Sequence, residues 1–209
     1  MKKWIWTTMI LTCVFILAAC SDEMNEPTPA TQVEGSLPDV DENDENTTEP
    51  AEEEEVVEDG FLPVTVNLKD SDGNSVGTVE LIEEEESLRI VVDAENLPEG
   101  THGFHFHEKG VCEAPDFESA GGHFNPTGAS HGFEHEDGSH AGDLPNLEVG
   151  PDGTVKEEFF VENLTLLAGE ENSLFHEGGT SLIIHAEADD GKTQPSGNSG
   201  DRIACGVVE

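Results

Sequence analysis

The sequence predicts an all-β domain, an antiparallel sandwich or barrel of about eight strands with two long functional loops. Three observations lead to this fold class: short runs in which apolar and polar residues alternate, turn sequences between the runs, and no stretch with convincing helical periodicity. Two segments, 109–142 and 188–201, are too long to be turns; taken together they are rich in Gly and Pro, and the first contains four histidines. Long loops in a compact β domain are usually functional or disordered, so we expect the chemistry there.

The first three strands are predicted at 62–70, 75–83 and 87–97, where apolar residues alternate around the turn SDGN and the charged corner EEEE. A fourth is predicted at 101–110, in THGFHFHEKG, after the turn LPEG. The segment 144–164 is predicted to be a hairpin with GPDG at its tip. The apolar runs TSLIIHAEA and RIACGVV supply the last two strands.

The N-terminal sequence is typical of a secretory signal. Two lysines precede an uncharged apolar stretch from Trp4 to Ala19, so residues 1–19 are predicted to be removed. The residues LAAC, which end at Cys20, resemble a bacterial lipobox, in which the new N-terminal cysteine carries lipid. We therefore expect an exported protein that is lipid-anchored at the outer face of the bacterial cell membrane and does not cross it. An ordinary signal peptide with an incidental cysteine is the alternative.

Acidic residues dominate the segment that follows. Residues 20–60 are predicted to be a lipidated and disordered tether, because sixteen Asp and Glu and no Lys or Arg lie between Ser21 and Gly60. An acidic motif that binds a partner is the alternative. The remaining segment, 61–209, has the size of one domain. The formal net charge of −39 excludes nucleic acid as a partner, because the phosphate backbone would be repelled.

The cysteines indicate one disulfide. Of the four cysteines, Cys13 leaves with the signal and Cys20 carries lipid, so Cys112 and Cys205 remain in the exported domain. An isolated pair in an oxidising compartment indicates a disulfide. Closing a loop of this length would stabilise the fold by roughly 4 to 5 kcal/mol through its effect on the unfolded chain.

Histidines gather in the fourth predicted strand. His105 and His107 occupy alternate positions, so their side chains point to the same face, about 6 to 7 Å apart, a separation that suits two imidazoles on one metal. His185 ends an apolar strand. Taken alone, a histidine in such a place is more often a satisfied core residue than a ligand.

The loop behind this strand contains a second candidate set: His123, His131, His140 and Asp143. Three imidazoles and a carboxylate are a normal tetrahedral set for zinc. A metal would also explain how so polar a loop becomes ordered. The alternative is that these are solvated loop histidines.

Five segments together resemble the copper/zinc superoxide dismutase family in its bacterial envelope form: GFHFHEKG, AGGHFNP, GDLPNL, IIHAEADD and GNSGDRIACGVV. The resemblance covers nearly the whole of 61–209 and implies an eight-stranded Greek-key β-barrel. It implies that copper is bound by His105, His107, His123 and His185. It implies that zinc is bound by His123, His131, His140 and Asp143, so that His123 bridges the two metals.

The resemblance also assigns roles to residues outside the two metal sets. Arg202 would draw superoxide to copper, and Asp189 would hydrogen-bond one copper and one zinc histidine. Cys112 and Cys205 would form the family's disulfide. The implied activity is dismutation of superoxide to dioxygen and hydrogen peroxide by a copper redox cycle that protects the cell envelope, with His123 taking up and returning a proton. A copper donor is a candidate partner, and no sequence feature marks the oligomeric state.

Charges around Arg202 depart from the family pattern. Asp201 stands where the family usually has a small or uncharged residue, and we expect it to weaken the local positive field. Lys192 and Lys109 are weaker candidates for positive charges in the same funnel. We therefore expect a rate that rises or stays flat with added salt.

Two other functions fit parts of the sequence. The first is a non-catalytic envelope protein that binds metal or handles copper on the same fold, which a missing copper ligand would indicate. The second is an acidic adhesin or spacer with a zinc-stabilised head, which would leave the strand histidines idle. The remaining histidines match nothing in the family pattern and are expected at the surface or in packing: His102, His135 and His176.

Overall fold

The computed structural model describes residues 62–136 and 138–209. The predicted signal at 1–19 and the lipidated acidic tether at 20–60 lie outside these residues, so the expectations about them stay predictions. Among the described residues, none forms a helix that is long and apolar enough to span a membrane. The described chain is β structure with one short 3-10 helix, η1 (Glu118–Ala120).

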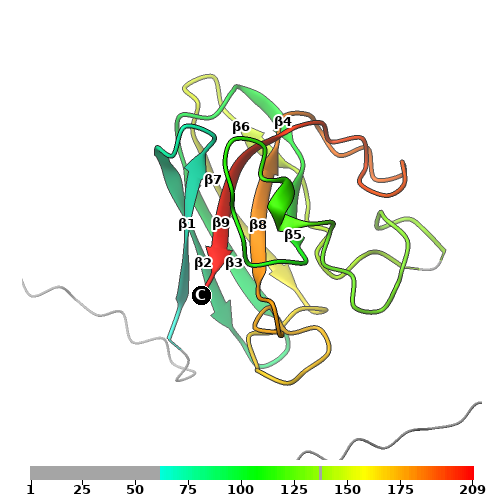
Figure 1. Cartoon of the computed structure of the whole chain (residues 1–209). Helices are drawn as coiled ribbons and strands as arrows, with labels where there is room; N and C mark the ends of the chain where they lie inside the picture. Colours follow the sequence, from blue (N-terminus) through cyan, green and yellow to red (C-terminus); the bar gives the residue numbers. More distant parts are fainter. Residues whose placement is uncertain (1–61, 137) are drawn as a thin grey trace, which may run out of the picture. The chain divides into compact units, whose positions relative to one another are not determined.

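Nine strands make up the described part of the chain. They are β1 (Val64–Asp70), β2 (Ser75–Glu83), β3 (Leu88–Ala94), β4 (Gly100–His102), β5 (Phe104–His107), β6 (Leu147–Val149), β7 (Val155–Val161), β8 (Thr180–His185) and β9 (Arg202–Val208). Seven form one sheet in the order β5-β8-β9-β1-β2-β3-β7, and β4 pairs with β6. All pairs are antiparallel, and the sheet curls around its core (Figure 1), which confirms the predicted antiparallel all-β fold.

The difference between eight predicted and nine observed strands comes from Gly103. This residue separates β4, which pairs with β6, from β5, which pairs with β8. Its N–H donates to Glu187 O at 2.8 Å, and its carbonyl accepts from His185 N–H at 2.8 Å. A Cβ at this position would stand 2.8 Å from Cβ of Ser199. The fourth predicted strand is therefore one extended segment that changes partner at a glycine.

The predicted hairpin at 144–164 has the expected turn, but its two arms do not pair with each other. Gly150 N–H donates to Thr154 O at 2.9 Å, which closes the turn. The arms then separate, because β6 pairs with β4 whereas β7 pairs with β3. The expectation of a simple hairpin was wrong, and the turn instead links the two-stranded pair to the seven-stranded sheet.

The alternation that predicts the strands also fills the core. On β1, Val66 and Leu68 are fully buried, whereas Thr65 and Asn67 face solvent. Leu88, Ile90 and Val92 repeat the pattern on β3 and join the same apolar cluster. Full burial of such a side chain contributes about 1.5 to 3 kcal/mol. The barrel is therefore a packed scaffold onto which the long loops are fastened.

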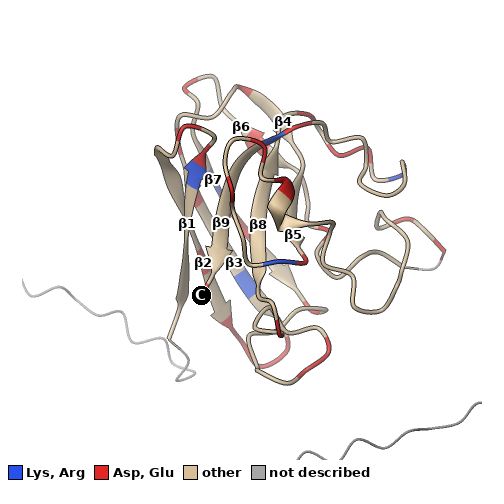
Figure 2. Ribbon diagram, in the orientation of Figure 1, with Lys and Arg blue, Asp and Glu red and all other residues tan. Residues whose placement is uncertain are grey.

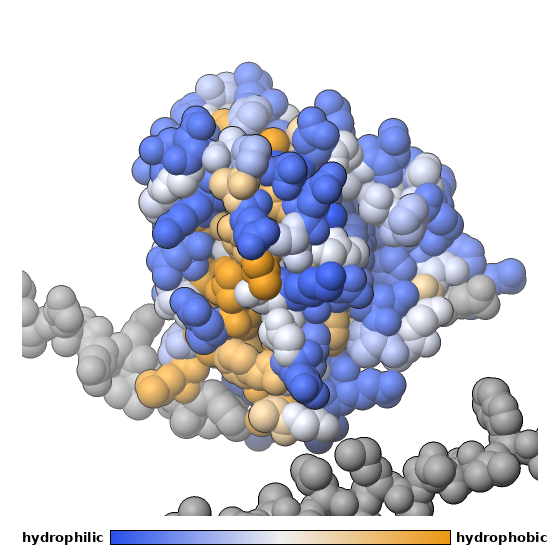
Figure 3. Space-filling view, in the orientation of Figure 1, coloured by the Kyte–Doolittle hydropathy of each residue, from blue (hydrophilic) through white to orange (hydrophobic). Residues whose placement is uncertain are grey.

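The surface is acidic around most of the barrel. Figure 2 shows Asp and Glu on strands and loops alike, with few Lys and Arg between them. Figure 3 shows one face, over β1 and β9, where a stripe of apolar side chains is bordered by hydrophilic ones. Because the surface charge is mostly negative, the approach of any anion depends on local positive groups.

Candidate metal centre

Two paired strands set the positions of three imidazoles. His105 and His107 lie on the same face of β5, with ring centroids 6.5 Å apart, because side chains alternate along a strand. The strand β8 pairs with β5 and ends at His185 after a register shift. The ring of His185 lies 5.0 Å from that of His105 and 5.6 Å from that of His107.

His123 adds a fourth imidazole from the long loop. Its backbone bridges that of His107, and its ring centroid lies 4.0 Å from that of His105. We call these residues the four-histidine group: His105, His107, His123 and His185. One ligand atom from each lies within 4.8 Å of the others, and all four residues are buried.

Each ring of the four-histidine group has one buried nitrogen without a hydrogen-bond partner. These atoms are His105 Nδ1, His107 Nε2, His123 Nε2 and His185 Nε2. Leaving a buried polar atom unsatisfied costs about 1 to 3 kcal/mol, so four of them in one place require an explanation. Imidazole nitrogen is a preferred ligand of copper. The donor set therefore fits a copper ion.

The opposite nitrogen of each strand histidine donates a hydrogen bond. The acceptors are Asp189 Oδ2 for His105 at 2.6 Å, Gly121 O for His107 at 3.0 Å and Gly200 O for His185 at 3.2 Å. Such bonds fix the tautomer and the direction of each ring, and they leave the other nitrogen as a lone-pair donor.

A second group lies on the other side of the His123 ring. We call it the histidine–aspartate group: His123, His131, His140 and Asp143. Oδ1 of Asp143 lies 2.8, 3.1 and 3.2 Å from the Nδ1 atoms of the three histidines, in that order. All four residues are buried, which excludes solvated loop histidines. The set has the composition of a tetrahedral zinc site.

His123 belongs to both groups through different nitrogens. Nδ1 faces Asp143, and the unpartnered Nε2 belongs to the four-histidine group. Burial lowers the pKa of His123 to about 4, despite the opposing effect of Asp143. Burial likewise lowers the pKa of His185 to about 3 and holds that of His107 well below its ordinary value. These rings are therefore neutral at neutral pH, the form in which imidazole binds metal.

The carboxylates are held as anions by hydrogen bonds. Burial alone would raise the pKa of Asp143, but bonds from the three histidines and from Gly132 N–H keep it well below its usual range. Asp189 behaves in the same way, because His105 and His131 outweigh the effect of burial. Although burial lowers the pKa of His131, its bonds to Asp143 and Asp189 raise it to about 9.

Asp189 connects the two groups. Its Oδ2 accepts from His105, and its Oδ1 lies 2.9 Å from Nε2 of His131. One carboxylate therefore orients one ring of each group. Such outer contacts typically change metal affinity 10- to 100-fold when they are removed.

Arg202, the first residue of β9, is hydrogen-bonded to the loop segment that precedes His123 in the sequence. Its Nη1 donates to Phe117 O at 2.5 Å, and its Nη2 donates to Gly121 O at 2.7 Å. Gly121 O also accepts from Nδ1 of His107. One carbonyl therefore joins the guanidinium to the four-histidine group.

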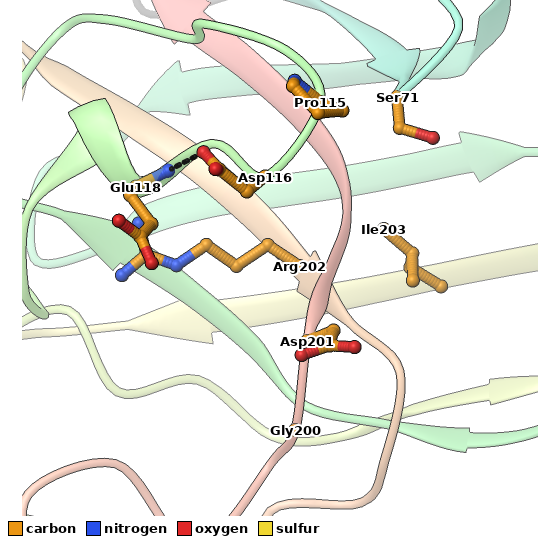
Figure 4. Close-up of a pocket in the computed structure, with 8 residues that line it drawn as sticks. All are labelled: Ser71, Pro115, Asp116, Glu118, Gly200, Asp201, Arg202 and Ile203. Carbon is orange, nitrogen blue, oxygen red and sulfur yellow. Dashed lines mark hydrogen bonds between the residues drawn. The ribbon is translucent and has the colours of Figure 1, made fainter.

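The cavity beside Arg202 has three acidic residues among the eight that line it. It has a volume of about 540 Å³, and Asp116, Glu118 and Asp201 line it together with the arginine (Figure 4). Neither of the two lysines named as candidates, Lys109 and Lys192, lines this cavity, and both are exposed. The positive field at this point comes from Arg202, and three carboxylates oppose it.

A disulfide fastens the same loop to the last strand. Cys112 and Cys205 are bonded, with Cα atoms 5.8 Å apart. Cys205 packs in a small buried cluster with Phe117 and Ile183. The disulfide therefore holds the loop segment whose carbonyls bind Arg202.

The three remaining histidines belong to neither group. His102 is buried, and its two ring nitrogens lie 2.7 Å from His185 O and 2.8 Å from Pro98 O. It therefore contacts the main chain at the end of β8 and not a donor group. His176 stacks on Phe124, with ring centroids 5.0 Å apart. His135 is exposed.

Two carboxamides of the site were missed by reasoning from sequence. Asn146 and Gln194 each hold the backbone of a residue in the centre, Asp189 and His131 respectively. The motif GDLPNL contains Asn146, but no pattern in the sequence shows which backbone it contacts. Gln194 carries no local signal.

An antiparallel barrel with two buried donor groups that share one imidazole defines a class of protein, the β-barrel metalloproteins with a bridged pair of metal sites. The family model for copper/zinc superoxide dismutase matches residues 75–208, and the chain belongs to this family. Copper and zinc are the metals that the family and the two donor groups support.

Similar proteins come from several bacteria. Superoxide dismutase [Cu-Zn] 2 of Aquifex aeolicus is 45% identical over 148 residues, which cover 70% of this chain and 86% of that protein. The superoxide dismutase-like protein YojM of Bacillus subtilis is 47% identical over 158 residues, or 75% of this chain and 81% of that protein.

A solved structure also resembles the domain. It is a double mutant of a superoxide dismutase (SOD)-like protein from Bacillus subtilis, in which a tyrosine and a proline are each replaced by histidine. It is 49% identical, with a TM-score of 0.67, and the match covers 69% of this chain and 95% of that one.

Proposed function

We propose that the protein dismutes superoxide, 2 O₂•⁻ + 2 H⁺ → O₂ + H₂O₂, with copper in the four-histidine group and zinc in the histidine–aspartate group. The observation that carries the proposal is the ring of His123, which offers one nitrogen to each buried donor group. Copper held by the four imidazoles would supply the one-electron redox chemistry that this reaction needs. Zinc held by the histidine–aspartate group would not change oxidation state, and its role would be to keep the loop and the shared ring in place.

The residues around the copper group supply rigidity and protons. The three strand histidines keep their positions because the β5–β8 ladder and the bonds from their second nitrogens hold each ring. Nε2 of His123 lies buried beside them without a hydrogen-bond partner. That nitrogen is placed to take up a proton and return it to the reduced oxygen.

Arg202 is proposed to dock the anion. Its guanidinium is fixed by two carbonyls, one of which it shares with His107. A fixed guanidinium presents both positive charge and paired N–H donors, which suits a small anion. The acidic residues around it reduce its long-range attraction but leave this geometry intact.

We further propose that the protein works outside the cytoplasm, attached by lipid on Cys20 and separated from the membrane by the acidic tether. The sequence of the first 60 residues supports this proposal. A Cys20→Ser variant should move from the membrane fraction to the soluble fraction and lose labelling by a fatty-acid analogue. Unchanged fractionation and labelling would exclude the anchor.

A non-catalytic metal-binding role is the second candidate. Two findings favour this second candidate: a relative from Bacillus subtilis is named only as superoxide dismutase-like, and in one solved structure of such a protein two histidines were introduced by mutation. In this chain both donor groups are complete and Arg202 is in place. The superoxide dismutase reaction therefore remains the function that the site supports best.

The test is to count copper and zinc per chain in the full-length purified protein while measuring superoxide dismutation. His123→Ala is compared with wild type, and His135→Ala, an exposed histidine outside both groups, is the matched control. We expect about one copper and one zinc per chain and an activity that His123→Ala abolishes and His135→Ala leaves unchanged. If the protein contains zinc but no copper, and shows no activity even after copper is supplied, the enzymatic function is rejected and the non-catalytic role stands.

A further inference from the structure

Three carboxamide side chains near the metal centre make the same kind of contact. Each accepts from the backbone N–H and donates to the carbonyl of a single residue. The pairs are Asn125 with Ala129 (3.0 and 2.9 Å), Gln194 with His131 (2.8 and 2.9 Å) and Asn146 with Asp189 (2.9 and 2.9 Å).

The contact made by Gln194 differs from that of Asn125 in what it joins. Asn125 and Ala129 are four residues apart in the same loop, whereas Gln194 and His131 are separated by 63 residues. Gln194 lies in the loop at 188–201, and His131 lies in the histidine–aspartate group. Gln194 therefore fastens one long loop to a candidate zinc ligand in the other.

The two loops approach each other closely where Gln194 holds them. A Cβ at Gly132, the residue after His131, would stand 2.0 Å from Gly191 O. The ring of His131 is engaged at both nitrogens, by Asp143 and Asp189. The contacts with Asp143 and Asp189 fix the direction of the His131 ring. The two hydrogen bonds with Gln194 fix the position of the His131 backbone.

We propose that Gln194 is a positioning residue for the zinc site, which holds the backbone of His131 and thereby makes zinc affinity depend on the 188–201 loop. This inference rests on the proposed function, because it takes zinc as the occupant of the histidine–aspartate group. The hydrogen bonds of Gln194 join main-chain groups of His131 and Lys192, and Gln194 belongs to neither donor group, so its contribution should vanish once zinc is saturating.

The experiment measures zinc affinity of the full-length protein by competition with a chromophoric chelator. Gln194→Ala removes the carboxamide, and Gln194→Met keeps a side chain of similar length without its hydrogen bonds. Asn125→Ala is the matched control, because it removes the same two bonds from Ala129, which is not a candidate ligand. The visible spectrum of Co²⁺ bound in place of zinc, and the kcat and KM at limiting and saturating zinc, are recorded for each protein.

We expect both Gln194 variants to lose about tenfold in zinc affinity, within the range for residues that orient metal ligands. Their Co²⁺ spectra should broaden, and their kcat and KM should return to wild-type values at saturating zinc. Asn125→Ala should change zinc affinity less than about threefold. Unchanged affinity in both Gln194 variants, or an equal loss in Asn125→Ala, would overturn the inference.

Failure of the proposed function can be told apart from failure of the inference about Gln194. Wild-type protein that binds zinc but shows no dismutation would contradict the enzymatic function, while the zinc comparison would still decide the role of Gln194. Wild-type protein that binds no zinc would overturn both.

Discussion

The α-carbon of Gly197 lies against the carboxylate of Asp189. A Cβ at Gly197 would stand 1.9 Å from Oδ1 of Asp189 and 2.7 Å from Nε2 of His131, far inside van der Waals contact. These are the two atoms through which Asp189 holds the histidine–aspartate group. Position 197 therefore requires a glycine, because the bonded Asp189 and His131 side chains occupy the space that a Cβ would need.

Replacing this glycine should disturb the metal centre. We expect Gly197→Ala to displace Asp189 and to lower zinc affinity 10- to 100-fold, with a parallel loss of activity at limiting zinc. The measurement is metal content and chelator competition. Gly128→Ala is the control, because Gly128 has a similar φ, +69° against +64°, but open space around a Cβ. Equal effects of the two substitutions would show that backbone strain, and not the contact with Asp189, is responsible.

The disulfide should contribute to both stability and substrate docking. We expect Cys112→Ser to lower the free energy of unfolding by roughly 2 to 5 kcal/mol, measured by urea denaturation. It should also raise KM, because the loop it releases carries the Phe117 and Gly121 carbonyls that hold Arg202. A variant with full metal content, reduced stability and an unchanged KM would show that the loop holds Arg202 without the disulfide.

Because of the acidic residues in the cavity, kcat/KM should either not depend on salt or rise as salt is added. Carboxylates of Asp116, Glu118 and Asp201 oppose Arg202, so screening removes repulsion along with attraction. We expect kcat/KM to rise or stay flat from low to moderate ionic strength. A steep fall over that range would contradict this reading of the field.

Removing one of these charges should raise the rate at low salt. Glu118→Gln or Asp201→Asn should increase kcat/KM by about twofold or more, and the gain should shrink as salt is added. Glu80→Gln, an exposed position on β2 that does not line the cavity, is the control. Equal gains from all three would trace the effect to net charge instead of to the cavity.

Removal of zinc should loosen the long loop more than the barrel. We expect amide exchange to increase over 121–136 and 138–143 when zinc is withdrawn, while β1 to β3 stay protected, because zinc binding would offset the cost of ordering this polar loop. With zinc at 100 times its Kd, its loss should lower the free energy of unfolding by about 2.7 kcal/mol. Uniform loss of protection in loop and barrel would show that the fold itself depends on zinc.

Much of the barrel and part of the centre follow from the sequence. The period of two placed most strands, and the positions of His105 and His107 follow from it directly. The change of partner at Gly103 was not predictable, because the alternation continues through it and only the fold shows two neighbours. The separation of β6 and β7 was not predictable either, because the turn between them has the sequence of an ordinary hairpin turn.

The parts of the centre that escaped sequence reasoning act through backbone or through distant loops. The strand pattern alone made His185 look like a core histidine, and only the family resemblance assigned it to copper; in the structure its Nε2 is buried beside β5 without a hydrogen-bond partner. Asn146 and Gln194 bind main-chain groups, which any residue possesses, so no partner could be named in advance. Gly197 is required by a contact that exists only after both loops have folded.

The β5–β8 ladder makes the two donor groups unequal in what they depend on. Three residues of the four-histidine group stand on those two strands, whereas His123 and the rest of the histidine–aspartate group belong to the loop. Three imidazoles are therefore placed by the hydrogen-bonded sheet itself, and the fourth is placed by the loop. A change confined to the loop leaves three nitrogens of the first group on paired strands but reaches every donor of the second.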